Sequence, residues 1–390
     1  METPRGTTGR PRRCWRLEKP GTVRCFGRTP LEEVGMSEPG NILITCGGKW
    51  VGHVLQLRQA MAEVPELTGG KIFIADRAAV TPAGQFADGN FVVPPIASDD
   101  YIEALFEICR KHRIRVLVPL IDIDVVRLAP YKEGFGRCGT AAILPPEPIA
   151  ELCFDKAAFH REATAAGVQT APMWTEATLD RAAFPVFAKP QRGFGSIGAR
   201  PCADLPEARR AIADAGERGP LVFERLLEGD ELSVDTYIGR DGRPSVAVQR
   251  IREQVVGGEA YRSRTVFRPE AWEMAQKAIR FLAERGHRGP VNIQMILGTE
   301  SGIIDVNPRL GSAVVLSNMA TGGRLFRTML AEACGHDADG DPTDYVRDMR
   351  LYRFLGDVFY RDDVPLAVFP TPSTEHESDV AGDSPNRRVA

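Results

Sequence analysis

The chain has 390 residues, of which 43% are hydrophobic and 26% charged, and its formal net charge is -3. This length is too great for one ordinary hydrophobic core and suits two or three lobes. The sequence contains neither a basic domain-sized patch nor a basic run interleaved with aromatic residues, which argues against a nucleic-acid partner. No apolar stretch approaches the length that spans a bilayer, which argues against a membrane partner.

The eight cysteines are scattered along the chain, without a Cys-x-x-Cys pair and without a histidine at ligand spacing. This pattern indicates neither a zinc site nor a disulfide framework. We therefore expect a protein of the reducing cytoplasm.

Both ends of the chain lack a folding pattern. Residues 1–40 begin with a stretch that is rich in Arg, Gly and Pro, poor in acids and without apolar periodicity, so it cannot bury enough surface to fold. We expect a disordered tail, with a targeting peptide or a true start at Met36 as the alternatives. Residues 371–390 are equally polar, and we expect a second disordered tail there.

Between the tails, short apolar runs alternate with helical patterns. The first part contains strands at 41–46, 71–75, 116–120 and 142–144, and helices at 51–62, at 101–112 and near Val125. Strands that alternate with helices predict a parallel sheet covered on both faces. We therefore expect residues 41–150 to form a Rossmann-like lobe.

The turn Gly47-Gly-Lys-Trp-Val-Gly52 leaves two interpretations open. It is no Walker loop, because Trp50 follows Lys49 where Ser or Thr is needed. It fits a dinucleotide fingerprint loosely, with Asp76 at the end of the second strand as the ribose-binding acid. A tight turn from strand to helix needs no ligand, although the helix N-terminus can still hold an anion.

The stretch Gly302–Gly311 sets Asp305, Asn307 and Arg309 at alternate positions. On an extended strand, alternate residues share a face, so all three can point at one site. Asp and Asn oxygens suit Mg²⁺, and the Arg fork suits a charged oxygen cluster. A solvated strand end is the alternative interpretation.

A second strand, at 290–297, precedes this one across the turn 298–302. We expect the two strands to form a hairpin. Their pairing would bring Gln294 close to Asp305 and Asn307.

Further upstream, the apolar strand 184–190 has Lys189 as its last polar residue and runs into the small-residue loop 193–198. The lysine supplies a point charge, and such a loop lets backbone N–H groups approach phosphate oxygens closely. An exposed lysine before a glycine turn is the alternative.

Residues 221–237 predict a strand, a short linker and another strand. An apolar linker between two sheets makes a slot for a flat ring. Glu231, seven residues after Glu224, can then accept hydrogen bonds from sugar hydroxyls, unless both glutamates are simply solvated.

Four arginines cluster around Gly257-Gly258 in what we expect to be a hairpin: Arg250, Arg252, Arg262 and Arg264. One or two of them can grip a substrate carboxylate bidentately. A solvated basic face is an equally good interpretation.

In chain order, these features resemble the ATP-grasp ligases, and most closely their carbamoyl-phosphate-synthase-like branch. The motifs are Lys156 in Phe-Asp-Lys-Ala-Ala-Phe, Lys189, the loop 193–198, the segment 224–231, Gln294 and Asp305-Val-Asn-Pro-Arg309. In that branch a strand ending in Glu-x-Asn-Pro-Arg is followed by a Ser-rich segment and Ala-Thr-Gly, as residues 311–322 are here. The resemblance covers roughly residues 41–335.

The resemblance implies an α/β fold. A Rossmann-like N-terminal (pre-ATP-grasp) lobe at 41–150 would be followed by a two-lobed ATP-grasp α+β domain at 151–340. Within it, a mobile lid would cover about 170–226. Residues 341–370 would form a C-terminal packing segment.

The resemblance also implies ATP and Mg²⁺ as cofactors, with Mn²⁺ as a substitute, and a role for each motif. The residues that would bind ATP are Lys156, Lys189, Gly193, Gly195, Ser196 and Gly198 for the phosphates, Glu224, Leu226 and Leu227 for adenine, and Glu231 for ribose. Those that would hold the metal are Gln294, Asp305 and Asn307. Arg309 and Lys189 would be catalytic. The family usually has Glu at the position of Asp305, and the shorter carboxylate is expected to bridge two metal ions less well.

The implied activity is that of an ADP-forming ligase, which activates a small carboxylate as an acyl phosphate for attack by an amine. The sequence contains no evident Ser-His-Asp or Cys-His arrangement, which agrees with chemistry that needs no protein nucleophile. Transfer to a carrier thiol, phosphorylation of a carbonate-type species and a nucleotide-binding module without catalysis are the alternatives. A homodimer is compatible with the sequence.

Overall fold

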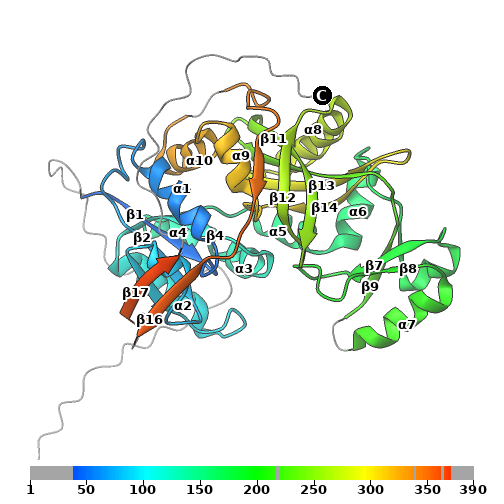
Figure 1. Ribbon diagram of the computed structural model, residues 1–390, viewed down its shortest axis with the longest axis horizontal. Helices are drawn as coiled ribbons and strands as arrows, with labels where there is room; N and C mark the ends of the chain where they lie inside the picture. The colour runs from blue at the N-terminus through cyan, green and yellow to red at the C-terminus, as the bar shows by residue number, and fades with distance from the viewer. Residues whose placement is uncertain (1–37, 217–218, 338–339, 362–363, 370–390) are drawn as a thin grey trace, which may run out of the picture. The chain divides into compact units, whose positions relative to one another are not determined.

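The computed structural model of the chain describes residues 38–216, 219–337, 340–361 and 364–369 (Figure 1). The chain divides into two compact units after Arg353. The tails predicted at 1–40 and 371–390 lie outside the described residues, apart from 38–40. Among the described residues, no helix has the length and apolarity that a bilayer crossing requires.

The N-terminal lobe contains a five-stranded parallel sheet with the order β3-β2-β1-β4-β5. Its strands are β1 (Asn41–Thr45), β2 (Ile72–Asp76), β3 (Gly89–Val92), β4 (Ile114–Pro119) and β5 (Ala141–Ala142). The connecting helices are α1 (Val51–Met61), η1 (Ala83–Gln85), α2 (Asp100–Lys111), α3 (Asp122–Leu128), η2 (Ala129–Tyr131) and α4 (Lys132–Arg137). The parallel sheet predicted for this lobe is confirmed, and β3 is an additional strand.

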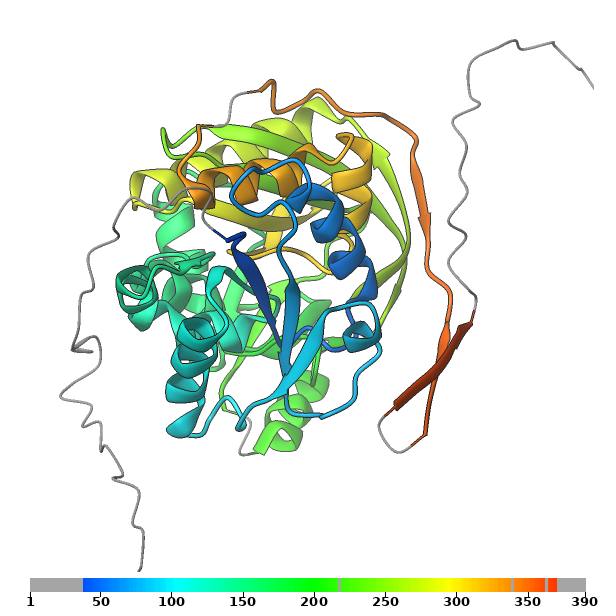
Figure 2. The same ribbon diagram turned by 90° about the vertical axis from the view of Figure 1, so that its left-hand side faces the viewer.

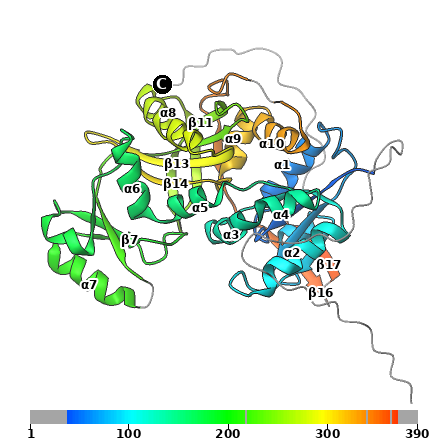
Figure 3. The ribbon, with the colours of Figure 1, turned by 180° about the vertical axis from the view of Figure 1, so that it is seen from behind.

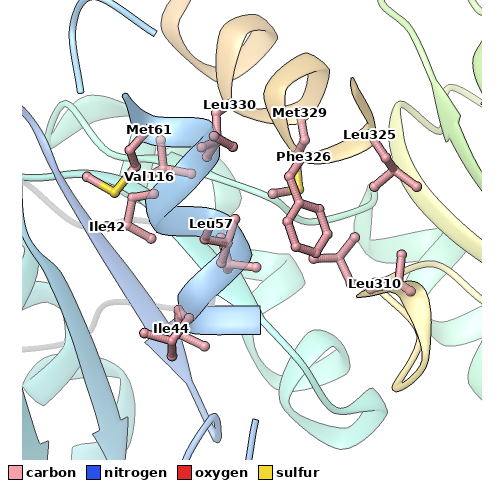
Figure 4. Packing of buried hydrophobic residues seen from close by; sticks show 14 of the residues in the cluster. Ile42, Ile44, Leu57, Met61, Val116, Leu310, Leu325, Phe326, Met329 and Leu330 are labelled. Carbon is pink, nitrogen blue, oxygen red and sulfur yellow. The ribbon is translucent and has the colours of Figure 1, made fainter. Parts of the chain in front are cut away.

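Helices cover both faces of this sheet (Figure 2). On one face, Ile42 and Ile44 of β1 pack with Leu57 of α1 and with Phe326 and neighbouring residues of α10 (Arg324–Cys334), as Figure 4 shows. On the other face, Leu43 packs in a second core with residues of α2, α3 and α4. Since β1 is buried on both sides, its sequence is a continuous apolar run.

A four-stranded antiparallel sheet follows, with the order β6-β9-β7-β8. Helices α5 (Glu147–Phe154) and α6 (Lys156–Ala165) lead into it, and its elements are β6 (Met173–Thr175), η3 (Glu176–Arg181), β7 (Val186–Pro190), β8 (Arg200–Cys202), α7 (Leu205–Ala215) and β9 (Leu221–Arg225). These elements bury a small core of their own and lie at one end of the unit (Figure 3). They fall within the predicted lid of about 170–226, whose mobility stays a prediction.

The largest sheet has six strands in the order β14-β13-β10-β11-β12-β15. The strands are β10 (Asp230–Ile238), β11 (Pro244–Val256), β12 (Glu259–Val266), β13 (Gly289–Leu297), β14 (Gly302–Asn307) and β15 (Arg350–Tyr352), and all neighbours are antiparallel. Leu232 and Val234 pack in one core with residues of α8 (Pro269–Glu284). Because alternate residues of a strand point to opposite faces, Glu231, Ser233 and Asp235 lie on the face away from that core.

The predicted hairpin of β13 and β14 is confirmed, with Gln294 directly opposite Asp305. The strand β14 ends at Asn307, so Arg309 does not follow by strand alternation as the sequence suggested. It lies in the turn that leads to α9 (Val314–Ala320), where its backbone N–H donates to the carbonyl of Asn307 at 2.8 Å.

Residues 341–370, predicted as one packing segment, contribute to both units. Up to Arg353 the segment belongs to the first unit and adds β15 to the edge of the six-stranded sheet. The second unit contains an antiparallel hairpin of β16 (Asp357–Arg361) and β17 (Val364–Phe369).

Candidate active site

A cavity of about 660 Å³ in the first unit is lined by residues from the N-terminal lobe, the four-stranded sheet and the six-stranded sheet. This volume lies in the range of small-molecule sites. Of the predicted site residues, the cavity collects all except Gly198: Lys156, Lys189, Gly193, Gly195, Ser196, Glu224, Leu226, Leu227, Glu231, Gln294, Asp305, Asn307 and Arg309.

The floor of the cavity is a row of polar residues that crosses four strands of the six-stranded sheet. Asp305 pairs with Gln294, Gln294 with Ser233, and Ser233 with Arg250. Side chains directly opposite one another on neighbouring strands project from the same face. A second row, of Asn307, Asn292 and Asp235, runs beside it. We call these seven residues the polar face.

The three predicted metal ligands lie together at the β13–β14 end of the polar face. Asn307 donates to Asp305 Oδ2 at 3.0 Å. Burial opposes ionisation of Asp305, but the charges of Lys156, Lys189 and Arg309 and the hydrogen bond from Asn307 together outweigh it and hold the pKa of its carboxyl below the ordinary value. One anionic carboxylate with two amide oxygens fits Mg²⁺, which usually keeps waters and phosphate oxygens in its shell.

The oxygen of Gln294 is already engaged. Its Oε1 accepts from Arg252 Nη1 at 2.9 Å, and its Nε2 donates to Asn292 at 3.0 Å. Gln294 would therefore have to release or share Arg252 in order to ligate an ion. The part of the chain that the structure describes holds no cluster of three or more His, Cys, Asp or Glu residues of metal-binding type, so Asp305 would supply the protein's negative charge.

Lys189 and Glu224 form a buried ion pair, with Nζ and Oε1 2.7 Å apart. The ammonium also donates to the carbonyl of Ile304 at 2.7 Å, which leaves one of its three protons for a ligand. Burial raises the pKa of Glu224, although Lys189 opposes that rise. The Glu224 side chain, predicted to border the adenine slot, thus pairs with Lys189, which is predicted to bind phosphate.

The glycine loop 193–198 has close neighbours on two sides. Lys156 Nζ donates to the carbonyl of Gly193 at 2.9 Å. On the other side, a Cβ built on Gly258, in the β11–β12 turn, would lie only 2.8 Å from Ser196 Oγ. Gly195 and Ser196 have φ angles of 65° and 56°, in the left-handed region that glycine adopts readily and that is unfavourable for a residue with a Cβ such as serine. From the sequence, Gly258 is only part of the expected hairpin between the arginines, and its contact with this loop has no local sequence signal.

Arg309 is bound bidentately by Asp122, at 2.7 Å from Nε and 2.6 Å from Nη2. Burial disfavours the charge of Arg309, but the Asp122 carboxylate outweighs it and holds the pKa above the ordinary value. Sequence reasoning missed Asp122. The available signal was its position just after β4, because ligands of α/β sheets bind at the carboxyl ends of the strands.

The four arginines near Gly257 separate into two pairs. Arg250 and Arg252 are buried and line the cavity, where Arg250 binds Asp235 at 2.8 Å and Arg252 binds Glu231 at 2.5 Å. Arg262 instead stacks on Tyr352, and Arg264 pairs with Glu253 and Asp348. The structure therefore favours a ligand role for the first pair and surface contacts for the second.

The backbone of the turn 47–52 is hydrogen-bonded within the N-terminal lobe. Asp76, the candidate ribose acid, accepts from the backbone N–H of Gly48 at 3.1 Å, and a Cβ at Gly48 would meet that carboxylate at 2.7 Å. This contact supports the interpretation of a tight turn without a dinucleotide. Trp50 and His53 beyond the turn line the cavity.

Two family models match the chain. Residues 42–143 match the PylC-like N-terminal domain, and residues 153–313 match the ATP-grasp domain. The predicted fold class, a Rossmann-like lobe followed by an ATP-grasp domain, is confirmed. No curated protein matches the chain.

Similar solved structures support the same fold. The biotin carboxylase domain of Hydrogenobacter thermophilus 2-oxoglutarate carboxylase, solved with MgADP, ADP and bicarbonate, has 17% identity and a TM-score of 0.65, and the match covers 80% of this chain and 73% of that one. The L-amino acid ligase from Bacillus licheniformis has 16% identity and a TM-score of 0.59, with coverage of 77% and 75%. The N5-carboxyaminoimidazole synthetase from Staphylococcus aureus, complexed with ADP, has 13% identity and a TM-score of 0.61, with coverage of 77% and 79%.

Proposed function

Because residues 153–313 match the ATP-grasp domain, we propose that the chain is an ATP- and Mg²⁺-dependent, ADP-forming ligase that joins a small carboxylic acid to an amine. The carboxylic acid is an amino acid or another small metabolite. The observation that carries the proposal is the single cavity into which distant segments bring two lysines, a glycine loop, the polar face and Arg309. The related structures solved with ADP are consistent with a nucleotide in this cavity.

In this proposal, Lys156, Lys189 and the loop 193–198 bind the phosphates, and the segment 224–227 borders the adenine. Glu231 accepts from the ribose. Asp305 and Asn307 hold Mg²⁺, with Gln294 once Arg252 releases its oxygen. The ion would neutralise charge on the phosphate oxygens.

The chemistry needs two displacements. A carboxylate oxygen of the substrate forms a bond to the γ-phosphorus of ATP, the bond from that phosphorus to the bridging oxygen breaks, and ADP leaves. The amine nitrogen then bonds to the acyl carbon and loses a proton, while phosphate leaves with the former carboxylate oxygen. Such transfers ask for positioning and charge stabilisation and require no protein nucleophile.

Arg309 suits the transferred phosphoryl group. Asp122 and the carbonyl of Leu310 engage three of the five N–H donors that a guanidinium has, so the others remain for phosphoryl oxygens. Asp122 fixes the orientation of the fork, and Arg309 then needs no rearrangement during transfer.

The test is to incubate the purified full-length chain with Mg-ATP and a pool of L-amino acids, and to follow ADP, AMP, phosphate and pyrophosphate. We expect ADP and phosphate in equal amounts, dependent on the amino acids. Stoichiometric pyrophosphate, or ADP release that no carboxylate or amine stimulates, would overturn the proposal.

A further inference from the structure

At the β10–β11 end of the polar face, two buried side chains have polar atoms without a hydrogen-bond partner. They are Nη1 of Arg250 and Oγ of Ser233. Arg250 is 3% exposed and Ser233 is 0% exposed, and both line the cavity. The two residues lie directly opposite each other on neighbouring strands, so their side chains are adjacent on one face. Buried polar atoms usually have a hydrogen-bond partner, and these two atoms without one belong to adjacent side chains.

The rest of the Arg250 guanidinium is fixed. Asp235 accepts from its Nε at 2.8 Å, and Asp235 is itself held by Asn292 and Ser317, each at 2.6 Å. One edge of the fork is therefore immobilised against the protein, and Nη1 remains for a ligand. A planar fork with free N–H groups binds carboxylates well.

Two further guanidinium groups lie near Arg250. Burial lowers the pKa of Arg252 and of Arg353, and the nearby charge of Arg250 lowers both further. The charge of Arg250 therefore acts on both of these guanidinium groups, although Glu231 pairs with Arg252 and Glu259 with Arg353, and an anion bound at Arg250 Nη1 would offset that repulsion.

Although Gln294 pairs with Ser233, this end is too far from Asp305, the charged residue among the predicted metal ligands, to receive the carboxylate that is phosphorylated. Along the row from Asp305, Ser233 lies two strands away and Arg250 three strands away. With strands about 4.8 Å apart, the separations are roughly 10 and 14 Å between backbones. An anion held by Arg250 and Ser233 is therefore a different group from the one that meets the γ-phosphate.

We propose that Arg250 Nη1 and Ser233 Oγ form a subsite for a second carboxylate, one that takes no part in the phosphoryl transfer; this inference rests on the proposed ligase function. The carboxylate belongs either to an α-amino acid that serves as the amine or to a dicarboxylic acid that serves as the acyl donor. The apolar residues Trp50, Leu120 and Ile121 line the same cavity and would contact the body of that substrate.

The experiment compares substrates with and without the second carboxylate in the full-length protein. The probes are the proteinogenic L-amino acids, succinate and glutarate, each tested with Mg-ATP by ADP release. Every active compound is then replaced by its carboxamide, so amino acid amides report on the amine side and the dicarboxylic monoamides on the donor side. Loss of a charge-assisted hydrogen bond should raise KM about 10-fold or more.

Two variants connect that effect to the subsite. Ser233→Ala removes a hydroxyl that makes no hydrogen bond in the protein, and Arg250→Lys keeps a charge opposite Asp235 but lacks Nη1. Each should raise KM for the acid about 10-fold, leave KM for ATP unchanged and have little effect on the carboxamide. Ser245→Ala is the matched control, because it removes a buried hydroxyl of β11 that does not line the cavity. It should behave like the unaltered protein.

Equal KM values for acid and carboxamide would overturn the subsite, as would variants that raise KM for ATP alone, since Arg250 would then serve the nucleotide. If no probe stimulates ADP release, the same probes are tested for thermal stabilisation of the protein with Mg-ADP. Stabilisation by acids but not by carboxamides, lost in Ser233→Ala, would keep the subsite while the ligase function fails. The lack of such stabilisation would contradict the subsite.

Discussion

Asp305 is the carboxylate on which the predicted metal site depends, because Gln294 and Asn307 contribute only neutral amides. It accepts from Asn307 at 3.0 Å, and the charges of Lys156 and Lys189 help to keep its pKa below the ordinary value against the effect of burial. A neutral amide at position 305 could still accept from Asn307. The charge of this residue can therefore be removed with little change to packing.

We expect Asp305→Asn to abolish turnover and to leave the melting temperature within a few degrees of the original. Asp305→Glu, with the family's usual carboxylate, should keep or raise the rate. ADP release under saturating Mg-ATP and thermal unfolding are the two measurements. An active Asp305→Asn variant would mean that Asp305 is only a solvated strand residue, whereas an inactive protein that Asp305→Glu restores would indicate decayed catalysis.

Lys189 has a structural role in its ion pair with Glu224 and a proposed role in ATP binding, and its substitution must separate the two. Lys189→Ala should weaken ATP binding severely, but it also leaves Glu224 buried without its partner, at a cost of about 3–5 kcal/mol. The double variant Lys189→Met with Glu224→Gln removes both charges, so its stability should recover while ATP binding stays weak. Calorimetric titration with ATP and urea unfolding give the two readouts. If the double variant binds ATP normally, Lys189 is purely structural.

Asp124 in the N-terminal lobe predicts a pH dependence of stability. Burial raises the pKa of its carboxyl to about 6, although Thr45 and Tyr101 both donate to it. Since the folded pKa lies above the unfolded one, this contribution to stability is present below about pH 4 and is lost as the pH rises through about 6. The unfolding free energy should fall by up to about 3 kcal/mol over that window. Asp124→Asn should remove this component, and urea titrations at several pH values would reveal it.

At the scale of elements, the glycine loop and the β11–β12 turn depend on each other. Gly258 approaches Ser196 so closely that a Cβ would lie 2.8 Å from the hydroxyl oxygen, while a Cβ on Gly257 would meet nothing within 4 Å. Both glycines have positive φ, at 77° and 56°, so the strain of an alanine is similar at the two positions. The pair therefore isolates the effect of the contact with the loop.

Gly258→Ala should weaken ATP binding beyond any effect of Gly257→Ala, because it displaces the loop as well as straining the turn. We expect each variant to lose about 1–2 kcal/mol of stability from strain alone. The informative quantity is the ratio of their ATP dissociation constants, which we expect to be several-fold. A ratio near one would mean that the loop does not use this contact when nucleotide binds.

The elements that could be predicted are those with a local signal. The strands β1, β2 and β4 are apolar runs because helices cover both of their faces, and β13 and β14 are separated by a glycine-bounded turn. β3 was missed because it is short, half-buried at the sheet edge and begins with a glycine. The pairing of Arg309 with Asp122, 187 positions away, has no local signal at all.

At the scale of the whole first unit, Asp122 and Arg309 join the N-terminal lobe to the six-stranded sheet beside the cavity. Their side chains are 12% and 16% exposed, so the pair is largely screened from water. Residues of α1 and α10 provide the other major contact between these regions through a shared hydrophobic core. The lobes are thus held together by apolar packing, and the ion pair has a position suited to orienting Arg309, for which we propose a catalytic role.

Asp122→Asn tests which of these two roles dominates. If the pair mainly holds the lobes together, the variant should lose about 3–5 kcal/mol, because a buried guanidinium remains without its counter-charge. If it mainly orients Arg309, stability should fall less, since the asparagine oxygen can still accept one hydrogen bond and the apolar core is unchanged. The rate at saturating ATP should then fall at least about 10-fold with little change in ATP affinity.

We expect the second result, because Arg309 retains N–H donors for a ligand and its burial protects the remaining contacts. Urea unfolding and the rate of ADP release on the same preparation distinguish the outcomes, and Asp88→Asn is the matched control, since Asp88 pairs with Arg58 at an exposed position within the N-terminal lobe. If the Asp122→Asn variant has normal turnover, catalysis does not depend on the orientation that Asp122 gives to Arg309.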